Sequence, residues 1–349
     1  MKHNKMLGKQ SIEYSNPPVV LAGASTASKK EGEGPIGSFI DHIEEDFMFA
    51  QTTWEEAESE MIRRTVDSVI KKSGFTKDDI RFLVGGDLLG QLIATSFGIM
   101  TFDIPILGVY GACSTMAESI VIASMMIDGG FADKTLAVTS SHFAGAEKQF
   151  RFPLDFGNQR PLASTWTVTG CGAVVIGDSK LKENTEEELI YIKGVTIGKI
   201  VDYGVKDSMN MGACMAPAAY DTIRQHLQDY NRAPEYYDHI ITGDLGKVGS
   251  TILVDLLKED GYDISKLHLD CGLLIYDCDV QDTHSGGSGC GCSAITLTAY
   301  IFDKLRRREW KRILFVPTGA LLSTVSYNEG KSVPGVAHGV ILEVKDSER

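Results

Sequence analysis

The sequence lacks the features that mark secreted, membrane-spanning and metal-binding proteins. Its N-terminus carries basic residues but no apolar stretch of the kind found in a secretion signal. It has no run of about 18 apolar residues that could cross a membrane. The seven cysteines include no CxxC pair and lie mostly beside glycine or in apolar runs, which indicates reduced thiols. We therefore expect a cytoplasmic-type protein, peripheral at any membrane it contacts, with no metal and no cofactor.

Excess positive charge is also absent. With 34 basic and 47 acidic residues the formal net charge is -13, which argues against a nucleic-acid partner. An anionic ligand must then be held by local donors, since the overall field repels it. The 349 residues, of which 43% are hydrophobic and 23% charged, are enough for a large core or two fused cores.

The chain is organised around a stretch in which a strand is followed at once by a helix. Residues 104–109 predict a buried strand, and residues 114–127 predict a helix, with Cys113 in the tight turn between them. At such a turn the sulfur lies among unpaired backbone N–H groups at the positive end of a helix dipole, which lowers a thiol pKa. The alternative is that Cys113 is a buried packing residue among small neighbours.

Other segments complete an α/β pattern. Residues 54–72 have acidic residues first and lysines last, followed by Gly74, as in a helix with both ends signalled. Residues 134–141 predict a strand that ends at His142, and because carboxyl ends of parallel strands share one sheet edge, we expect Cys113 and His142 in one crevice. Residues 145–166 mix aromatic and basic side chains, among them Phe152, Phe156 and Arg151, and predict either a lid or dimer contact, or a satellite core.

The second half of the sequence repeats the first. A strand ending in Gly-Asp-Leu around Asp87 is echoed around Asp244, and the Cys113 elbow is echoed at residues 289–293. This predicts an α/β protein of two duplicated halves, residues 1–180 and 181–349, packed around a pseudo-twofold axis. Two helix N-termini then converge near the axis, where they favour a carboxylate, oxyanion or phosphate.

These residues resemble the thiolase superfamily, whose duplicated halves carry a nucleophilic cysteine at such an elbow. The resemblance implies a layered αβαβα fold. Within that superfamily, the strings EKQFRFPLDFGNQRP, STWTVTGCGA and GGSGCGCSA resemble the stage V sporulation protein AD family of spore-forming bacteria. That family is implicated in moving dipicolinic acid, pyridine-2,6-dicarboxylate, into the developing spore and binds that compound.

The sequence departs from the enzymes of the superfamily at their catalytic partners. Ketoacyl synthase III enzymes carry a histidine where this chain has Gly243 and Asp244, and an asparagine, or in thiolases a second histidine, near a turn that here has only Gly, Ser and Cys. Without them the cysteine lacks the base and donors of a condensation reaction. The resemblance thus implies a non-enzymatic binding protein. The rival hypothesis is a Cys-dependent acyl-transfer enzyme with altered partners, in which Cys113 is the nucleophile and His142 its helper.

The resemblance also implies the ligand, partners and assembly. We expect dipicolinic acid, with the role of calcium left open, to lie against the two helix N-termini, an aromatic wall from residues 150–166 and a basic side chain. The expected ligand-binding residues are Cys113, His142, Arg160, Lys247, Cys290, Gly291 and Cys292. Other membrane-embedded stage V sporulation proteins would hold the protein at the spore inner membrane. We further expect a homodimer that pairs through an apolar edge strand such as residues 135–141.

Overall fold

Two sheet layers with the same strand order form the frame of the molecule. The computed structural model describes residues 5–150, 160–182 and 188–345. The first layer contains β3 (Val19–Ser28), β5 (Phe82–Asp87), β6 (Ile106–Gly108), β7 (Lys134–Ser141) and β9 (Gly170–Gly177). The second contains β10 (Ile190–Thr196), β11 (His239–Gly243), β12 (His268–Asp270), β14 (Arg312–Ala320) and β16 (Gly339–Val344).

The layers match in order and in direction. The first runs β6-β5-β7-β9-β3 and the second β12-β11-β14-β16-β10. In each, the three strands at one end are parallel, and the remaining pairs are antiparallel. The layers join where β3 and β10 pair over Val19 and Val20. The duplication predicted from the sequence is therefore present in the topology.

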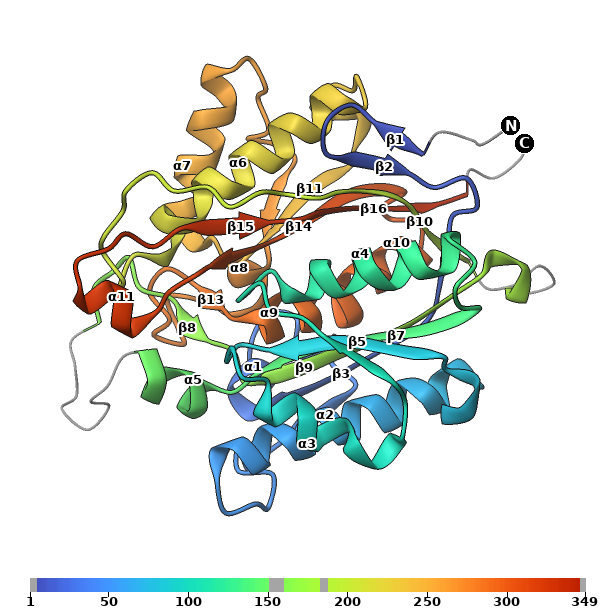
Figure 1. Ribbon diagram of the computed structural model, residues 1–349. Coiled ribbons are helices and arrows are strands. Elements are labelled where there is room, and N and C mark those ends of the chain that lie inside the picture. The colour runs from blue at the N-terminus through green and yellow to red at the C-terminus, as the bar shows by residue number, and fades with distance from the viewer. Residues whose placement is uncertain (1–4, 151–159, 183–187, 346–349) are drawn as a thin grey trace.

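Helices cover both layers and fill the space between them, which gives the five-layer αβαβα arrangement (Figure 1). The helices α2 (Trp54–Ser73) and α3 (Ile93–Ile99) cover the outer face of the first layer, and α6 (Met211–Asp229) and α7 (Gly246–Glu259) cover that of the second. Between the layers lie α4 (Thr115–Asp128), α9 (Cys290–Ile295), a π-helical segment (Thr296–Ile301) and α10 (Phe302–Arg306). Because the helices between the layers have apolar neighbours on both sides, they belong to the central core.

Shorter elements connect this frame. The strands β1 (Met6–Leu7), β2 (Ser11–Glu13), β4 (His42–Glu44) and β15 (Gly335–Ala337) add to the layers, while β8 (Trp166–Thr167) and β13 (Gly287–Ser288) form a separate parallel pair. The short helices are α1 (Lys29–Gly32), α5 (Phe143–Phe150), α8 (Cys271–Ile275) and α11 (Thr324–Asn328). Single 3-10 turns occur at Gly37–Phe39, Lys77–Asp79, Met100–Phe102, Ser179–Lys182 and Pro234–Tyr236. The pairing of β8 with β13 matters most for function, because it brings residues far apart in sequence to one wall.

The helix expected at residues 54–72 is present, and both of its ends are capped. Thr53 and Glu56 make a reciprocal capping box, and Gly74 closes the helix in the left-handed conformation at a φ of 75°. One face of the helix is buried against β3 and the rest of the first layer, as its spacing of apolar residues requires.

Two expectations about strands were wrong. The apolar residues 104–109 form no buried strand, because β6 lies at the end of the first layer, where Ile106 and Leu107 are 41% and 44% exposed. The residues proposed as a dimerising edge belong to β7, which has β5 on one side and β9 on the other. The free edge of this layer in the described structure is therefore β6.

The predicted boundary between residues 180 and 181 falls in the segment that connects β9 to β10. Part of that segment, residues 183–187, lies outside the described residues, as do Arg151, Phe152 and Phe156 of the predicted aromatic excursion.

Candidate functional site

Cys113 lies in a strained elbow immediately before α4. Ala112 has a φ of 49°, in the left-handed region that residues with a side chain seldom adopt. The turn is held by Ser114, whose backbone N–H and hydroxyl both donate to the carbonyl of Gly111. The hydroxyl of Thr115 donates to the carbonyl of Ala112 at 2.5 Å. This elbow presents the Cys113 side chain toward the second half of the molecule, where it is only 9% exposed.

Asp244, the residue after β11, faces the Cys113 thiol. The carboxyl and the thiol lie close enough that each shifts the pKa of the other. The second carboxyl oxygen of Asp244 accepts a hydrogen bond from the backbone N–H of Gly289 at 3.0 Å, and the first lies 3.2 Å from the Thr318 hydroxyl. The predicted convergence of the Cys113 turn and the turn before α9 is therefore present, but a carboxyl of the protein itself occupies it.

The predicted low pKa of Cys113 is wrong. Burial raises the pKa of the thiol well above its usual value, and the neighbouring Asp244 carboxyl raises it further, whereas the Gly289 N–H lowers it by less. Burial likewise raises the pKa of Asp244 to about 8. Burial and the carboxyl that faces the sulfur outweigh the helix dipole. In the folded protein Cys113 is thus a neutral thiol at neutral pH.

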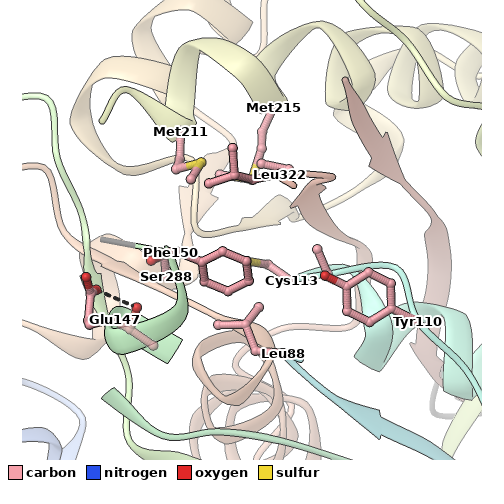
Figure 2. A pocket seen from close by; sticks show the side chains of 12 residues that line it. Leu88, Tyr110, Cys113, Glu147, Phe150, Met211, Met215, Ser288 and Leu322 are labelled. Carbon is pink, nitrogen blue, oxygen red and sulfur yellow. Dashed lines mark hydrogen bonds between the residues drawn. The ribbon is translucent and has the colours of Figure 1, made fainter. Parts of the chain in front are cut away.

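The cavity beside Cys113 is small and mostly apolar. Its volume is about 40 Å³, enough for water but far below that of a typical ligand site. Figure 2 shows the Phe150 ring close to Cys113, with Met211, Met215 and Leu322 on the α6 side. The polar side chains of Glu147 and Thr167 are hydrogen-bonded to each other at 2.9 Å. No lysine, arginine or histidine is among the described residues that line this cavity.

His142 does not share the crevice of Cys113, contrary to the expectation. It is delivered by the end of β7, as predicted, but it is buried and lines a second cavity. Its Nε2 is hydrogen-bonded to the backbone carbonyl of Phe47 at 2.9 Å, and burial lowers its pKa. This neutral ring is in no position to act as a base for Cys113.

The wall between the two cavities is built by α5 and β8. In α5, Phe143 lines the second cavity, whereas Glu147 and Phe150, one and two turns later, line that of Cys113. In β8, Trp166 faces the second cavity and Thr167 the first, as side chains alternate along a strand. Neighbouring residues in sequence thus belong to different cavities.

The second cavity is large, open and lined by both aromatic and basic side chains. Its volume is about 350 Å³. Phe143 stacks on Trp166 at 4.2 Å between ring centroids, and the Lys30 ammonium lies 4.4 Å from the Trp166 ring centroid. The Arg160 guanidinium is 4.8 Å from the same ring. Phe47 is 56% exposed at this cavity.

Acidic side chains accompany these cations. Glu31 is fully buried and accepts hydrogen bonds from Ser28, Tyr276 and the backbone N–H of Thr169. Glu33 and Glu45 also line the cavity, and Glu45 pairs with Lys29 at 2.9 Å. The Glu31 contacts anchor α1, which carries Lys30, to α8 and β9.

The remaining predicted ligand residues are dispersed. Cys290 and Cys292 are fully buried; the Cys290 thiol is hydrogen-bonded to the Ser140 carbonyl at 2.9 Å. The Gly291 N–H donates to the Ser141 hydroxyl. Lys247 lies at the surface, where it pairs with Asp279 at 3.3 Å. Of the predicted set, only His142 lines the second cavity and only Cys113 lines the first, while the Arg160 guanidinium lies 4.8 Å from the Trp166 ring centroid.

Two residues of interest, Asp244 and Lys30, were missed by the sequence reasoning. Asp244 was read as part of the Gly-Asp-Leu repeat and as the absence of a histidine, and Lys30 was not singled out. Trp166 had been placed in the expected aromatic wall of residues 150–166. The signal for Lys30 was weak, since nothing near it in sequence indicates that α1 packs beside β8.

The described residues contain neither a metal-binding cluster nor a membrane-spanning helix. Across residues 5–150, 160–182 and 188–345, no group of three or more His, Cys, Asp or Glu side chains is placed to hold a metal ion. Within the same ranges, no helix is long and apolar enough to span a membrane.

Comparison with known proteins gives consistent results at the level of family and fold. The model of a family described as "Stage V sporulation protein AD" matches residues 8–343. A relative of that name from Bacillus subtilis (strain 168) is 44% identical over 339 residues, which cover 97% of this chain and 98% of the relative. Among solved structures, 3-oxoacyl-[acyl-carrier-protein] synthase III from Aquifex aeolicus VF5 matches with a TM-score of 0.55 and 11% identity, covering 93% of this chain and 99% of that one. Cerulenin-bound OleA from Xanthomonas campestris matches with a TM-score of 0.55 and 15% identity, covering 97% of this chain and 98% of that one.

Proposed function

The chain belongs to the stage V sporulation protein AD family, and on this premise we propose that it is a non-enzymatic protein that binds dipicolinate and takes part in moving it into the developing spore. The ligand comes from the family resemblance. In this proposal the protein has no catalytic residue, works as a homodimer, and is held at the spore inner membrane by other, membrane-embedded stage V sporulation proteins. Whether calcium accompanies the ligand is a separate question for the same binding experiment.

One observation carries the non-enzymatic half of the proposal. The Cys113 thiol faces the carboxyl of Asp244, where the condensing enzymes that the sequence resembles have a histidine. A nucleophilic cysteine needs a base or a cationic neighbour that stabilises the thiolate. A carboxyl has the opposite effect, and the apolar cavity beside it leaves little room for a thioester arm. The rival acyl-transfer hypothesis has His142 as the helper of Cys113, but His142 lines the other cavity, and Asp244, with its pKa raised to about 8, is mostly protonated at neutral pH.

Two measurements on the wild-type protein test the proposal. Isothermal titration with dipicolinate should show saturable binding, with and without added calcium ions. Incubation with acetyl-CoA should leave the intact mass of the protein unchanged and release no coenzyme A. Absence of dipicolinate binding by the folded protein would refute the binding half. A stable acetyl adduct on Cys113 together with turnover would favour the acyl-transfer enzyme instead.

A further inference from the structure

We infer that a third cavity, where α2, α3 and α5 meet, is a binding site for a primary ammonium group, with the carboxylate of Glu58 as its principal contact. This cavity lies at the outer face of the first layer (Figure 1). The described residues that line it are different from those that line the cavity of Cys113. The site is therefore independent of the ligand proposed above, and it takes a cation rather than an anion.

Glu58 occupies a position of α2 that the helical period assigns to the core. It shares the inward face of the helix with Met61, Ile62 and Thr65, which follow it at helical spacing and are also buried. Glu58 itself is only 3% exposed. An ionisable side chain at such a position is costly unless a contact replaces the water that it loses. Its hydrogen bonds therefore decide what the cavity can hold.

Only one of the two carboxyl oxygens of Glu58 has a partner among the described residues. Its Oε1 accepts a hydrogen bond from the Ser140 hydroxyl of β7 at 2.7 Å. Its Oε2 has no hydrogen-bond partner in the described part of the chain. Because Ser140 holds Oε1, Oε2 is the oxygen that Glu58 presents to the cavity that it lines. A hydrogen-bond donor in the cavity would satisfy an acceptor that the free protein leaves unsatisfied.

A second buried carboxyl makes the potential at Glu58 more negative. Asp87 ends β5, and its register partner on β7 is Ser140, the residue that donates to Glu58. Burial, and after it the charges of Asp87 and Glu55, raise the pKa of Glu58 to about 8, against the opposing effect of the Ser140 hydrogen bond. A cation beside Glu58 offsets this repulsion and favours the ionised carboxylate.

The other titratable groups around Glu58 are thiols. Cys171 of β9 and Cys290 at the start of α9 are both fully buried. Burial raises the pKa of Cys171 to about 12 and that of Cys290 well above its usual value. Both thiols are therefore neutral when Glu58 ionises, and they supply no positive charge.

No basic side chain is among the described residues that line this cavity. Its two acidic residues are Glu58 and Glu55, and Glu55 is exposed, with no ion pair to a described residue. Lys148, which precedes the cavity residue Gln149 in α5, has its ammonium 5.2 Å from the Trp54 ring centroid. The negative charge of the cavity is thus left for a cationic ligand to neutralise.

The composition of the cavity favours an ammonium group over a metal ion. The described residues hold no group of three His, Cys, Asp or Glu side chains placed to bind a metal, and hard divalent cations need several oxygen ligands. The cavity volume is about 520 Å³, within the range of small-molecule sites. Leu89, Ile93 and Ala94 form an apolar part of its wall. An alkylammonium group therefore fits, because it brings N–H donors to Oε2 and methylenes to the apolar wall.

The test is a calorimetric titration of the full-length protein with n-butylamine and with the neutral 1-butanol, at a pH of about 9, where Glu58 is ionised. Saturable binding is expected for the amine alone. Glu58→Gln keeps the size of the side chain and should weaken amine binding by about tenfold or more, as the loss of a charge-assisted contact requires. Glu60→Gln is the matched control on the same helix, because Glu60 is already paired with Arg63 and Arg64. It should change affinity by about threefold at most.

Two further probes distinguish the sources of such a group. Nα-acetyl-lysine amide represents the lysine side chain of another protein, and spermidine represents a free polyamine. Whichever of the two binds more tightly in the same titration identifies the source. Either result supports the site, provided that Glu58→Gln weakens the binding.

Three results would overturn the site. One is the absence of saturable binding of any of the three amines by the wild type, and another is equal affinity of the wild type and a folded Glu58→Gln. The third is an equal loss in Glu58→Gln and Glu60→Gln, which would show that only the general charge of this face attracts amines. Thermal unfolding checks that each variant is folded. Since no dipicolinate is used, failure of the proposed function leaves this test unaffected.

Discussion

Replacing Asp244 with asparagine should make the Cys113 thiol more reactive, and only at alkaline pH. The substitution keeps the size of the side chain and removes its charge. Because burial raises the pKa of Asp244 to about 8, the carboxyl is mostly protonated at a pH of about 6.5 and mostly ionised at about 9.5. An ionised carboxyl facing the sulfur disfavours the thiolate, whereas a neutral one does so much less. The two proteins should therefore react alike at the lower pH and differ at the higher one.

The size of the effect follows from the contact between the two groups. Unit charges about 4 Å apart repel by roughly 4 kcal/mol at an effective dielectric constant of about 20, or about 3 pKa units for the thiol. A thiolate of lower pKa is intrinsically less nucleophilic, which cancels roughly half of that gain. We expect Asp244→Asn to alkylate at Cys113 about 30-fold faster than the wild type at the higher pH and at nearly the same rate at the lower one.

The assay is alkylation by iodoacetamide with peptide-level mass spectrometry, since Cys278 is the one cysteine that is not buried among those in the described structure and will also react. Cys113→Ser assigns the signal. Asp87→Asn is the matched control, because Asp87 ends β5 as Asp244 follows β11 but hydrogen-bonds Thr95 and the backbone of Leu89. The role of the Asp244 charge would be refuted if Cys113 alkylated at the same rate in Asp244→Asn and in the wild type at the higher pH. It would also be refuted if the variant were faster by the same factor at both pH values.

Three further predictions concern assembly and stability. Leu107→Lys on the exposed edge strand β6 should convert a dimer to a monomer in light scattering, whereas Phe131→Lys, at an exposed phenylalanine elsewhere, should not; a monomeric wild type would contradict this. Thr53→Ala, which removes the capping box of α2, should lower the free energy of unfolding by about 1 kcal/mol in urea titrations, and no measurable change would exclude a stabilising cap. Burial lowers the pKa of His226 to about 3. Below a pH of about 6.5 the unfolded chain therefore binds a proton at His226 that the folded protein excludes, and the free energy of unfolding falls as the pH falls below about 6.5. In His226→Gln that dependence should be flatter by up to about 1.4 kcal/mol per pH unit, and equal slopes would exclude His226 as its source.

The fold could be predicted because its signals are local and repeated. Buried strands that end in glycine, a capped helix at residues 54–73, and the two Gly-Asp-Leu segments are each readable within a few residues of sequence. The order of strands within a layer is not local. Residues 106–108 are as apolar as a central strand, yet they lie at the edge, because β6 pairs with β5 on one side and with no described strand on the other. Hydrophobicity predicts a strand but not its neighbours.

The candidate site was only partly predictable because its walls come from distant segments. Cys113 and His142 do end up near strand termini, as expected, but α5 and the β8–β13 pair divide them into separate cavities. That division depends on Gly287 pairing with Trp166, which are far apart in the chain. The position of Lys30 beside Trp166 likewise needs α1 to be anchored by the hydrogen bond between Glu31 and Tyr276. No periodicity or spacing in the sequence encodes these contacts.

Asp244 bears both on the proposed absence of condensation chemistry and on the proposed binding role. Two converging helix N-termini favour negative charge, and an enzyme leaves that position free for the oxyanion of its substrate. Here Asp244 accepts the Gly289 N–H and faces the Cys113 thiol, so the position is filled before any ligand arrives. A ligand that binds beside Cys113 must therefore either displace the Asp244 carboxyl from the Gly289 N–H or bind with that contact in place.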